Sequence, residues 1–208
     1  MTRGIFCIEG LWDNNLKRKS SVQPILSMLE LNAGIPFIYH DAATTEELEF
    51  YISKWKQPRL KNYPILYLAF HGAKSAILIE GRKYSLDLLA QKLKDSCAGN
   101  IIIFASCKTL RDSNGIVPHF LDSTKALALF GYRNKVNWMT AAALELLILA
   151  KLQNVTFSGR GMRAIERKIT SLASAFPQID YLFMIQQKAI KQKTTGSRRR
   201  GKMSIRSY

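Results

Sequence analysis

Short, apolar runs alternate along this chain with longer segments of helical periodicity, and this alternation restricts the fold more than any other feature. The runs from Ile65 to Phe70 and from Ile101 to Ala105 have the length of β-strands and contain no charged residue. Strands that are apolar on both faces need a cover on both sides, which is typical of a parallel sheet enclosed by helices. The sequence therefore predicts an α/β fold.

Strand length, helical spacing and capping signals predict the individual elements. The expected strands are residues 4–10, 35–39, 65–70, 101–105, 126–130 and 181–185, with a hairpin at 76–79 and 82–84; the expected helices are 21–31, 44–55, 86–94, 138–152 and 162–175. Gly34 is placed to end the first helix, and Ser85 can cap the third. Thr44 and Glu47 have the spacing of a capping box, which opens the second.

With 208 residues and 47% hydrophobic content, the chain can bury one substantial core. We expect one domain over residues 1–187, followed by a basic, flexible tail at 188–208. The most apolar stretch, Met139 to Ala150, is too short for a membrane span and contains Glu145. No membrane association and a cytoplasmic location are therefore expected.

The formal net charge of +16 favours acidic partners or nucleic acid, but its distribution weakens that inference. Eight of the 31 Lys and Arg residues lie in the tail at 188–208, which has no aromatic residue before Tyr208. Base stacking therefore has little support, although phosphate neutralisation by the tail stays open. A solvated tail is the favoured interpretation.

The three cysteines, Cys7, Cys97 and Cys107, are an odd number and lack C-x-x-C spacing. This argues against a disulfide framework and against a zinc site. Neither Cys7 nor Cys97 has an evident base nearby, so core or surface roles are expected for them. We expect free thiols, no metal and no cofactor.

Two reactive side chains directly follow predicted strands, where functional groups gather in parallel sheets. His71 follows the run ending at Phe70, and Cys107 follows Ala105 and Ser106. An imidazole can take the proton of a neighbouring thiol and later return it to a leaving amine. The backbone N–H groups of Gly72 and Cys107 are candidate donors to the developing oxyanion. Each residue alone would be interpreted as structural; together they predict a catalytic pair.

These local patterns resemble the caspase-like cysteine peptidases, which include caspases, metacaspases, gingipains and the bacterial CHAT proteases. The resemblance rests on Phe70-His71-Gly72, on Ala105 to Thr109, and on Gly131-Tyr132 followed by Val136-Asn137-Trp138. It covers residues 1–187, is closest to the CHAT type, and implies a three-layer sandwich with a mostly parallel central sheet. It also implies His71 as general acid and base, Cys107 as nucleophile and Gly72 as an oxyanion donor.

Substrate choice cannot be carried over, because Ala105 stands where caspases have glutamine and metacaspases have aspartate. Trp12, Asp13 and Asn137 should lie on loops beside the pair, so they are candidates to shape the substrate pocket, with capping or packing as the alternative. Glu145 interrupts an apolar helix and is expected to meet a cation or a backbone donor, with substrate recognition as a second role.

The resemblance implies cleavage of protein or peptide substrates through a thioester acyl-enzyme, in bacterial defence or regulated cell death. A peptidase of this size would need control by a regulatory sensor or an activating protein. Two alternatives remain at this point. One is an inactive caspase-like interaction module, and the other is nucleic-acid binding through the tail.

Overall fold

The computed structural model describes residues 2–187 except 14, 16, 19 and 113. Its central sheet has the strand order β2-β1-β3-β7-β8-β9. The strands are β1 (Ile5–Glu9), β2 (Phe37–Asp41), β3 (Ile65–Ala69), β7 (Ile101–Ala105), β8 (Ala128–Tyr132) and β9 (Tyr181–Ile185). All neighbours pair in parallel except β9, which runs antiparallel to β8. The predicted α/β class with a mostly parallel sheet is confirmed.

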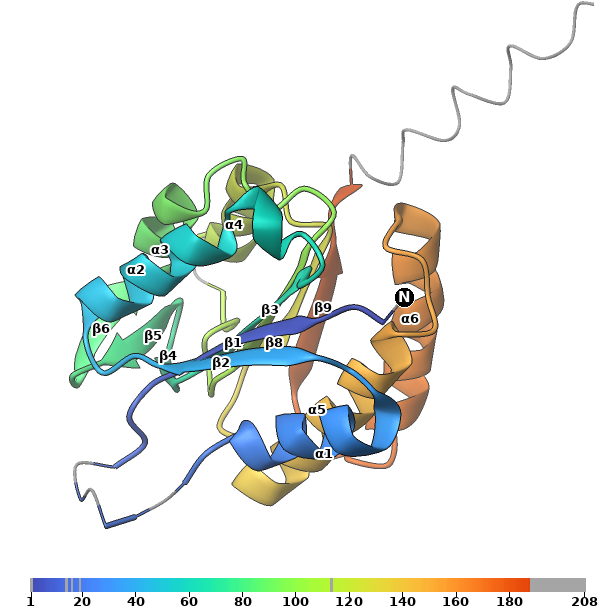
Figure 1. The fold of residues 1–208 in the computed structure, drawn as a ribbon, viewed down its shortest axis with the longest axis horizontal. Coiled ribbons are helices and arrows are strands. Elements are labelled where there is room, and N and C mark those ends of the chain that lie inside the picture. The colour runs from blue at the N-terminus through green and yellow to red at the C-terminus, as the bar shows by residue number, and fades with distance from the viewer. Residues whose placement is uncertain (1, 14, 16, 19, 113, 188–208) are drawn as a thin grey trace, which may run out of the picture.

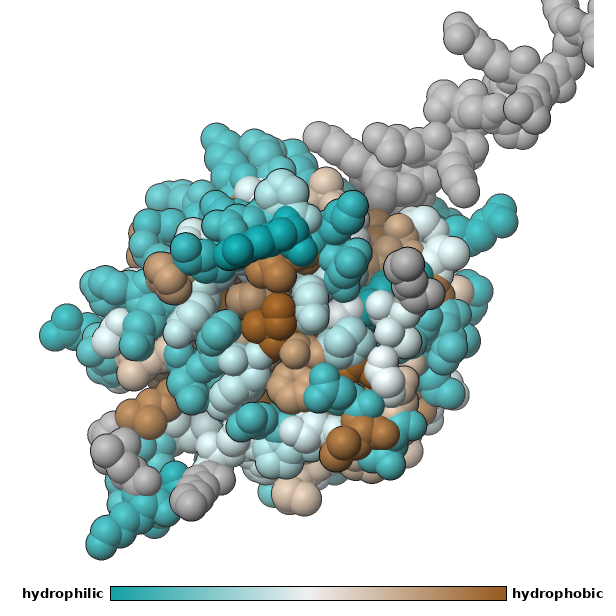
Figure 2. All heavy atoms as spheres, in the orientation of Figure 1, coloured by the Kyte–Doolittle hydropathy of each residue, from teal (hydrophilic) through white to brown (hydrophobic). Residues whose placement is uncertain are grey.

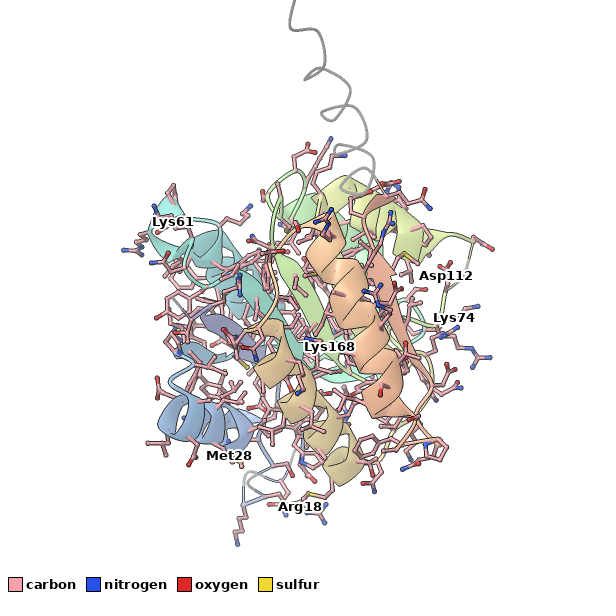
Figure 3. The ribbon with its side chains drawn as sticks, turned by 90° about the vertical axis from the view of Figure 1, so that its right-hand side faces the viewer. Arg18, Met28, Lys61, Lys74, Asp112 and Lys168 are labelled. Atoms are coloured by element: carbon pink, nitrogen blue, oxygen red, sulfur yellow. The ribbon has the colours of Figure 1, made fainter. Side chains whose placement is uncertain are left out.

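Helices cover both faces of this sheet and complete three layers (Figure 1). One face carries α1 (Gln23–Ala33), α5 (Trp138–Leu152) and α6 (Gly159–Ala173), and the other carries α2 (Thr45–Trp55), α3 (Leu86–Lys92) and α4 (Ile116–Thr124). Alternate residues serve the two faces, as in β3, where Tyr67 points to the first group and Leu68 to the second. Figure 3 shows α5 and α6 packed side by side over the first face.

Several predicted helix ends agree with the capping chemistry of the structure. The side chains of Thr44 and Glu47 form the reciprocal capping box at the start of α2, and Ser85 accepts from the Leu88 N–H at the start of α3. Gly34 ends α1 in the left-handed region at φ 60°. A residue without a Cβ adopts this conformation at little cost.

A small antiparallel sheet stands beside the central one and carries part of the site. Its strands are β4 (His71–Ala73), β5 (Ala76–Ile79) and β6 (Arg82–Ser85), in the order β4-β5-β6. The hairpin of β5 and β6 was expected, whereas β4 was not. The structure also adds α4 and a short 3-10 turn at Pro58–Leu60, and it places β8 two residues later than expected. Gly131 and Tyr132 therefore belong to β8 and do not follow it.

In the described part of the chain, no helix is both long enough and apolar enough to cross a membrane. The face shown in Figure 2 is mainly hydrophilic, with its hydrophobic residues in a few small groups. The expected basic tail at 188–208 lies outside the described residues.

Candidate active site

The sheet register brings His71 and Cys107 to one place. Strands β3 and β7 pair in parallel with Ala69 opposite Ala105, and the two reactive residues each follow these partners by two positions. Their side chains line the same cavity, which has a volume of about 220 Å³. The carboxyl edge of the sheet thus holds an imidazole and a thiol in one recess.

The imidazole of His71 is oriented by the loop that follows β1. Its Nε2 lies 2.7 Å from the backbone oxygen of Trp12. Because a carbonyl oxygen only accepts, Nε2 must carry the proton of this bond, and in the neutral ring Nδ1 is then the basic nitrogen. The Trp12 ring also packs edge-on against the imidazole, with ring centroids 5.1 Å apart. Nδ1 is therefore the atom that can exchange a proton with a thiol.

Trp12 is fixed in turn by Glu9 and Trp138. The Trp12 ring meets that of Trp138 edge-on at 4.6 Å, while Glu9, only 1% exposed, binds its indole. The Glu9 carboxylate accepts four hydrogen bonds, from the indole N–H of Trp12, the backbone N–H of Val22 and the hydroxyls of Ser21 and Tyr39. These donors compensate its burial. Glu9 thereby anchors the residue that orients His71.

Cys107 is half-buried on the loop that follows β7. Its Sγ lies 3.4 Å from the nitrogen of Val136, whose N–H donates to the sulfur. A thiolate accepts such a hydrogen bond more strongly than a thiol does. Among the described residues, the sulfur is hydrogen-bonded to the backbone of Val136 and not to His71. Catalytic hydrogen bonds are often loose before substrate binds, and a proton could pass between these two side chains only if they came closer together.

Gly72 packs so closely against the Cys107 loop that no side chain would fit. A Cβ at this position would lie 2.0 Å from the backbone oxygen of Cys107 and 2.5 Å from Oγ1 of Thr109. Thr109 is fully buried and bonds the hydroxyl of Ser106 and the oxygen of Ala76, at 2.7 and 3.1 Å. The backbone of β4 is therefore held directly against the loop that carries Cys107.

Glu145, on α5, is the charged residue buried in the wall of the cavity. It is 4% exposed, and its carboxylate accepts from the hydroxyls of Tyr132, at 2.7 Å, and Tyr67. Burial raises the pKa of Glu145 to about 7, even though the two tyrosine bonds favour the charged form. The prediction that Glu145 meets a cation or a backbone donor was wrong, because its partners are tyrosine hydroxyls from β3 and β8.

The remaining candidate residues occupy different places. Trp12 and Ala105 line the cavity together with His71 and Cys107. Asp13 lines a second cavity of about 700 Å³, which adjoins the first because Trp12 and His71 line both. The pKa of Asp13 is lowered, first by the Asn15 N–H and then by Arg18, which Figure 3 shows at the outer end of the loop.

Asn137 has the capping role that was the alternative to a pocket role. Its side chain accepts from the Thr140 N–H at the start of α5, at 3.2 Å. The flanking residues Val136 and Trp138 line the cavity instead. Sequence reasoning gave no site role to Glu9, Val136 or Trp138, although the last two belong to a motif on which the family resemblance rests. An acidic residue that ends an apolar strand was a usable signal for Glu9, whereas the other two depend on the tertiary packing of α5.

The other two cysteines lie in the core. Cys7 and Cys97 are fully buried, and burial raises the pKa of both thiols, that of Cys97 to about 12. Such thiols are unreactive near neutral pH, whereas Cys107 is half-buried. Among the described residues, no group of three or more His, Cys, Asp or Glu side chains could hold a metal ion.

Comparison with solved structures supports the fold. A crystal structure of caspase-1 from Spodoptera frugiperda matches with a TM-score of 0.55 and 11% sequence identity, over 88% of this chain and 86% of that one. At this identity the likeness concerns the fold, which is caspase-like. No curated protein matches the sequence. A model of a family of unknown function, DUF6642, matches residues 2–158, so the protein belongs to that family.

Proposed function

We propose that this protein is a cysteine endopeptidase in which His71 and Cys107 act as a catalytic pair. The observation that carries the proposal is the shared cavity, where Nδ1 of His71 is the basic nitrogen and the Cys107 sulfur is half-buried. The caspase-like fold of the solved neighbour supports it. It is a proposal about chemistry, which fold alone does not establish.

The first half of the proposed reaction forms a thioester. His71 takes the thiol proton on Nδ1, and the Cys107 thiolate attacks the carbon of the substrate amide, so that a C–S bond forms. The negative charge on the carbonyl oxygen is stabilised by the backbone N–H groups of Gly72 and Cys107. His71 then returns the proton to the leaving nitrogen as the C–N bond breaks.

The second half restores the enzyme. A water molecule attacks the thioester carbon while His71 accepts one of its protons. The C–S bond breaks, the peptide leaves with a new carboxyl group, and the proton returns to the sulfur. The bond from Nε2 to the Trp12 oxygen keeps the imidazole oriented throughout and stabilises the imidazolium that forms.

Turnover of a mixed peptide library by the purified full chain tests this function, with mass spectrometry of the new termini. We expect cleavage by the wild type and loss of at least a hundredfold in both Cys107→Ala and His71→Ala. Cys97→Ala is the matched control, because this buried thiol does not line the cavity, and it should keep activity. Undiminished cleavage by Cys107→Ala would overturn the proposal.

A further inference from the structure

The cavity beside Cys107 has walls that are mainly apolar and aromatic. Its wall residues include Trp12, Val22, Ile25, Val136 and Trp138. Because His71 and Cys107 line the same space, a side chain next to the bond under attack would enter it. Walls of this kind suit a long aliphatic stem, which gains by leaving water.

Glu145 places a carboxyl group inside this apolar space without a cationic partner. None of the salt bridges between described residues involves it. Tyr67 and Tyr132 each donate one hydrogen bond to it, and each carboxylate oxygen can accept another. Burial of Glu145 beside these two hydroxyls disfavours its ionised form. A cation that entered the cavity would stabilise the ionised carboxylate.

We propose that this cavity binds the lysine or arginine side chain that precedes the cleaved bond, with its cationic group against Glu145. The inference rests on the proposed peptidase function and names its substrate class. The aliphatic stem would lie along Trp12 and Trp138, and the charge would meet the buried carboxylate. Ala105 leaves room at the end of β7, because its side chain is only a methyl group.

Lys135 would favour a substrate of the opposite charge. It also lines the cavity and would attract an acidic side chain. Its side chain is exposed, whereas Glu145 is 4% exposed. Charge interactions are screened near solvent and strengthened in the interior, so the buried carboxylate should dominate the selection. Lys135 therefore provides the matched control for the test.

The test uses peptidyl acyloxymethyl ketones that differ only in the residue beside the reactive group: lysine, norleucine or aspartate. Norleucine keeps the aliphatic stem of lysine and lacks its charge. The measured quantity is the rate of Cys107 alkylation in the intact protein. We expect the lysine probe to react at least tenfold faster than the norleucine probe. In Glu145→Gln this ratio should fall to about one, while Lys135→Gln should keep it.

Equal wild-type rates for lysine and norleucine would overturn the inference, and this result needs no variant to fold. An unchanged ratio in folded Glu145→Gln would also overturn it, as would a preference for aspartate that Lys135→Gln abolishes. Failure of the peptidase function gives a different result, in which none of the three probes alkylates Cys107.

Discussion

The backbone oxygen of Trp12 lies 2.7 Å from Nε2 of His71. Through this bond the first loop of the chain determines which imidazole nitrogen is basic. Because Glu9 binds the indole of the same tryptophan, a residue at the end of β1 controls the orientation of a residue after β3. The neighbouring parallel pairing of β1 and β3 makes this arrangement possible.

Glu9→Gln should therefore impair the proposed catalysis while leaving His71 and Cys107 in place. A glutamine has one acceptor oxygen in place of two, so it cannot accept all four bonds that Glu9 receives. The unsatisfied groups should cost about 1–3 kcal/mol of stability. We expect kcat to fall at least tenfold while KM changes little, measured beside the free energy of unfolding. Glu49→Gln, at a surface ion pair with Lys92, should leave kcat unchanged.

Gly72→Ala should separate β4 from the loop that carries Cys107. The new Cβ would lie 2.0 Å from the oxygen of Cys107, and neither backbone can yield without shifting the site. We expect a loss of about 1–3 kcal/mol in stability and a drop in alkylation of Cys107. Gly81→Ala is a suitable control: its φ of +72° strains an alanine, but no atom lies within 4 Å of the new Cβ. It should destabilise the fold and leave the alkylation rate intact.

The stability of the protein should depend on pH through Glu145. Its pKa is about 7 in the folded state against an ordinary value of 4.5, so the folded state holds this proton more tightly. The neutral carboxyl therefore stabilises the fold most below pH 4.5, and this contribution is lost as pH rises to 7. The difference corresponds to about 3 kcal/mol.

Chemical denaturation at pH 5 and pH 8 checks this sign. Glu145→Gln should remove the dependence and be more stable than the wild type at pH 8. Glu49→Gln should leave the difference between pH 5 and pH 8 unchanged, because the hydrogen bond from Lys92 lowers the pKa of Glu49 and this carboxylate is ionised at both pH values. A lower stability of Glu145→Gln than of the wild type at pH 8 would contradict this sign.

Selection of a cationic substrate side chain should weaken at low pH. Only ionised Glu145 attracts a cation strongly, so the ratio of lysine to norleucine rates should fall between pH 7.5 and pH 5.5. The titratable groups buried around Glu145 are Cys7 of β1, Tyr67 of β3 and Tyr132 of β8, and burial raises the pKa of all three. His71, Cys107 and Lys135 line the same cavity. A ratio that stays constant with pH would contradict the assignment.

Much of the fold could be predicted because its signals are local. Apolar strands with alternate faces, the capping box at Thr44 and the left-handed Gly34 each follow from neighbouring residues. Strand β4 of the small sheet was not predicted, because three residues, His71–Ala73, are too few to show the alternation of a strand. Helix α4 begins without a side-chain cap and has Pro118 in its first turn, so it lacked the usual start signal.

The site was predictable where it depends on strand ends and not where it depends on packing. His71 and Cys107 follow strands, and parallel register brings such positions together. The contact of Trp12 with Trp138 joins residues 126 positions apart, and no local pattern encodes it. Glu145 shows the same limit, since its acidic nature was evident while its tyrosine partners come from β3 and β8.

Intact-mass analysis of the protein after reaction with the lysine acyloxymethyl ketone tests the pairing of His71 and Cys107 most directly. We predict one adduct, located on Cys107 by peptide mapping, because Cys7 and Cys97 are fully buried. The adduct should be absent in Cys107→Ala and should form at least a hundredfold more slowly in His71→Ala. Alkylation of Cys107 at the same rate in His71→Ala, or no adduct on Cys107, would contradict the catalytic pair.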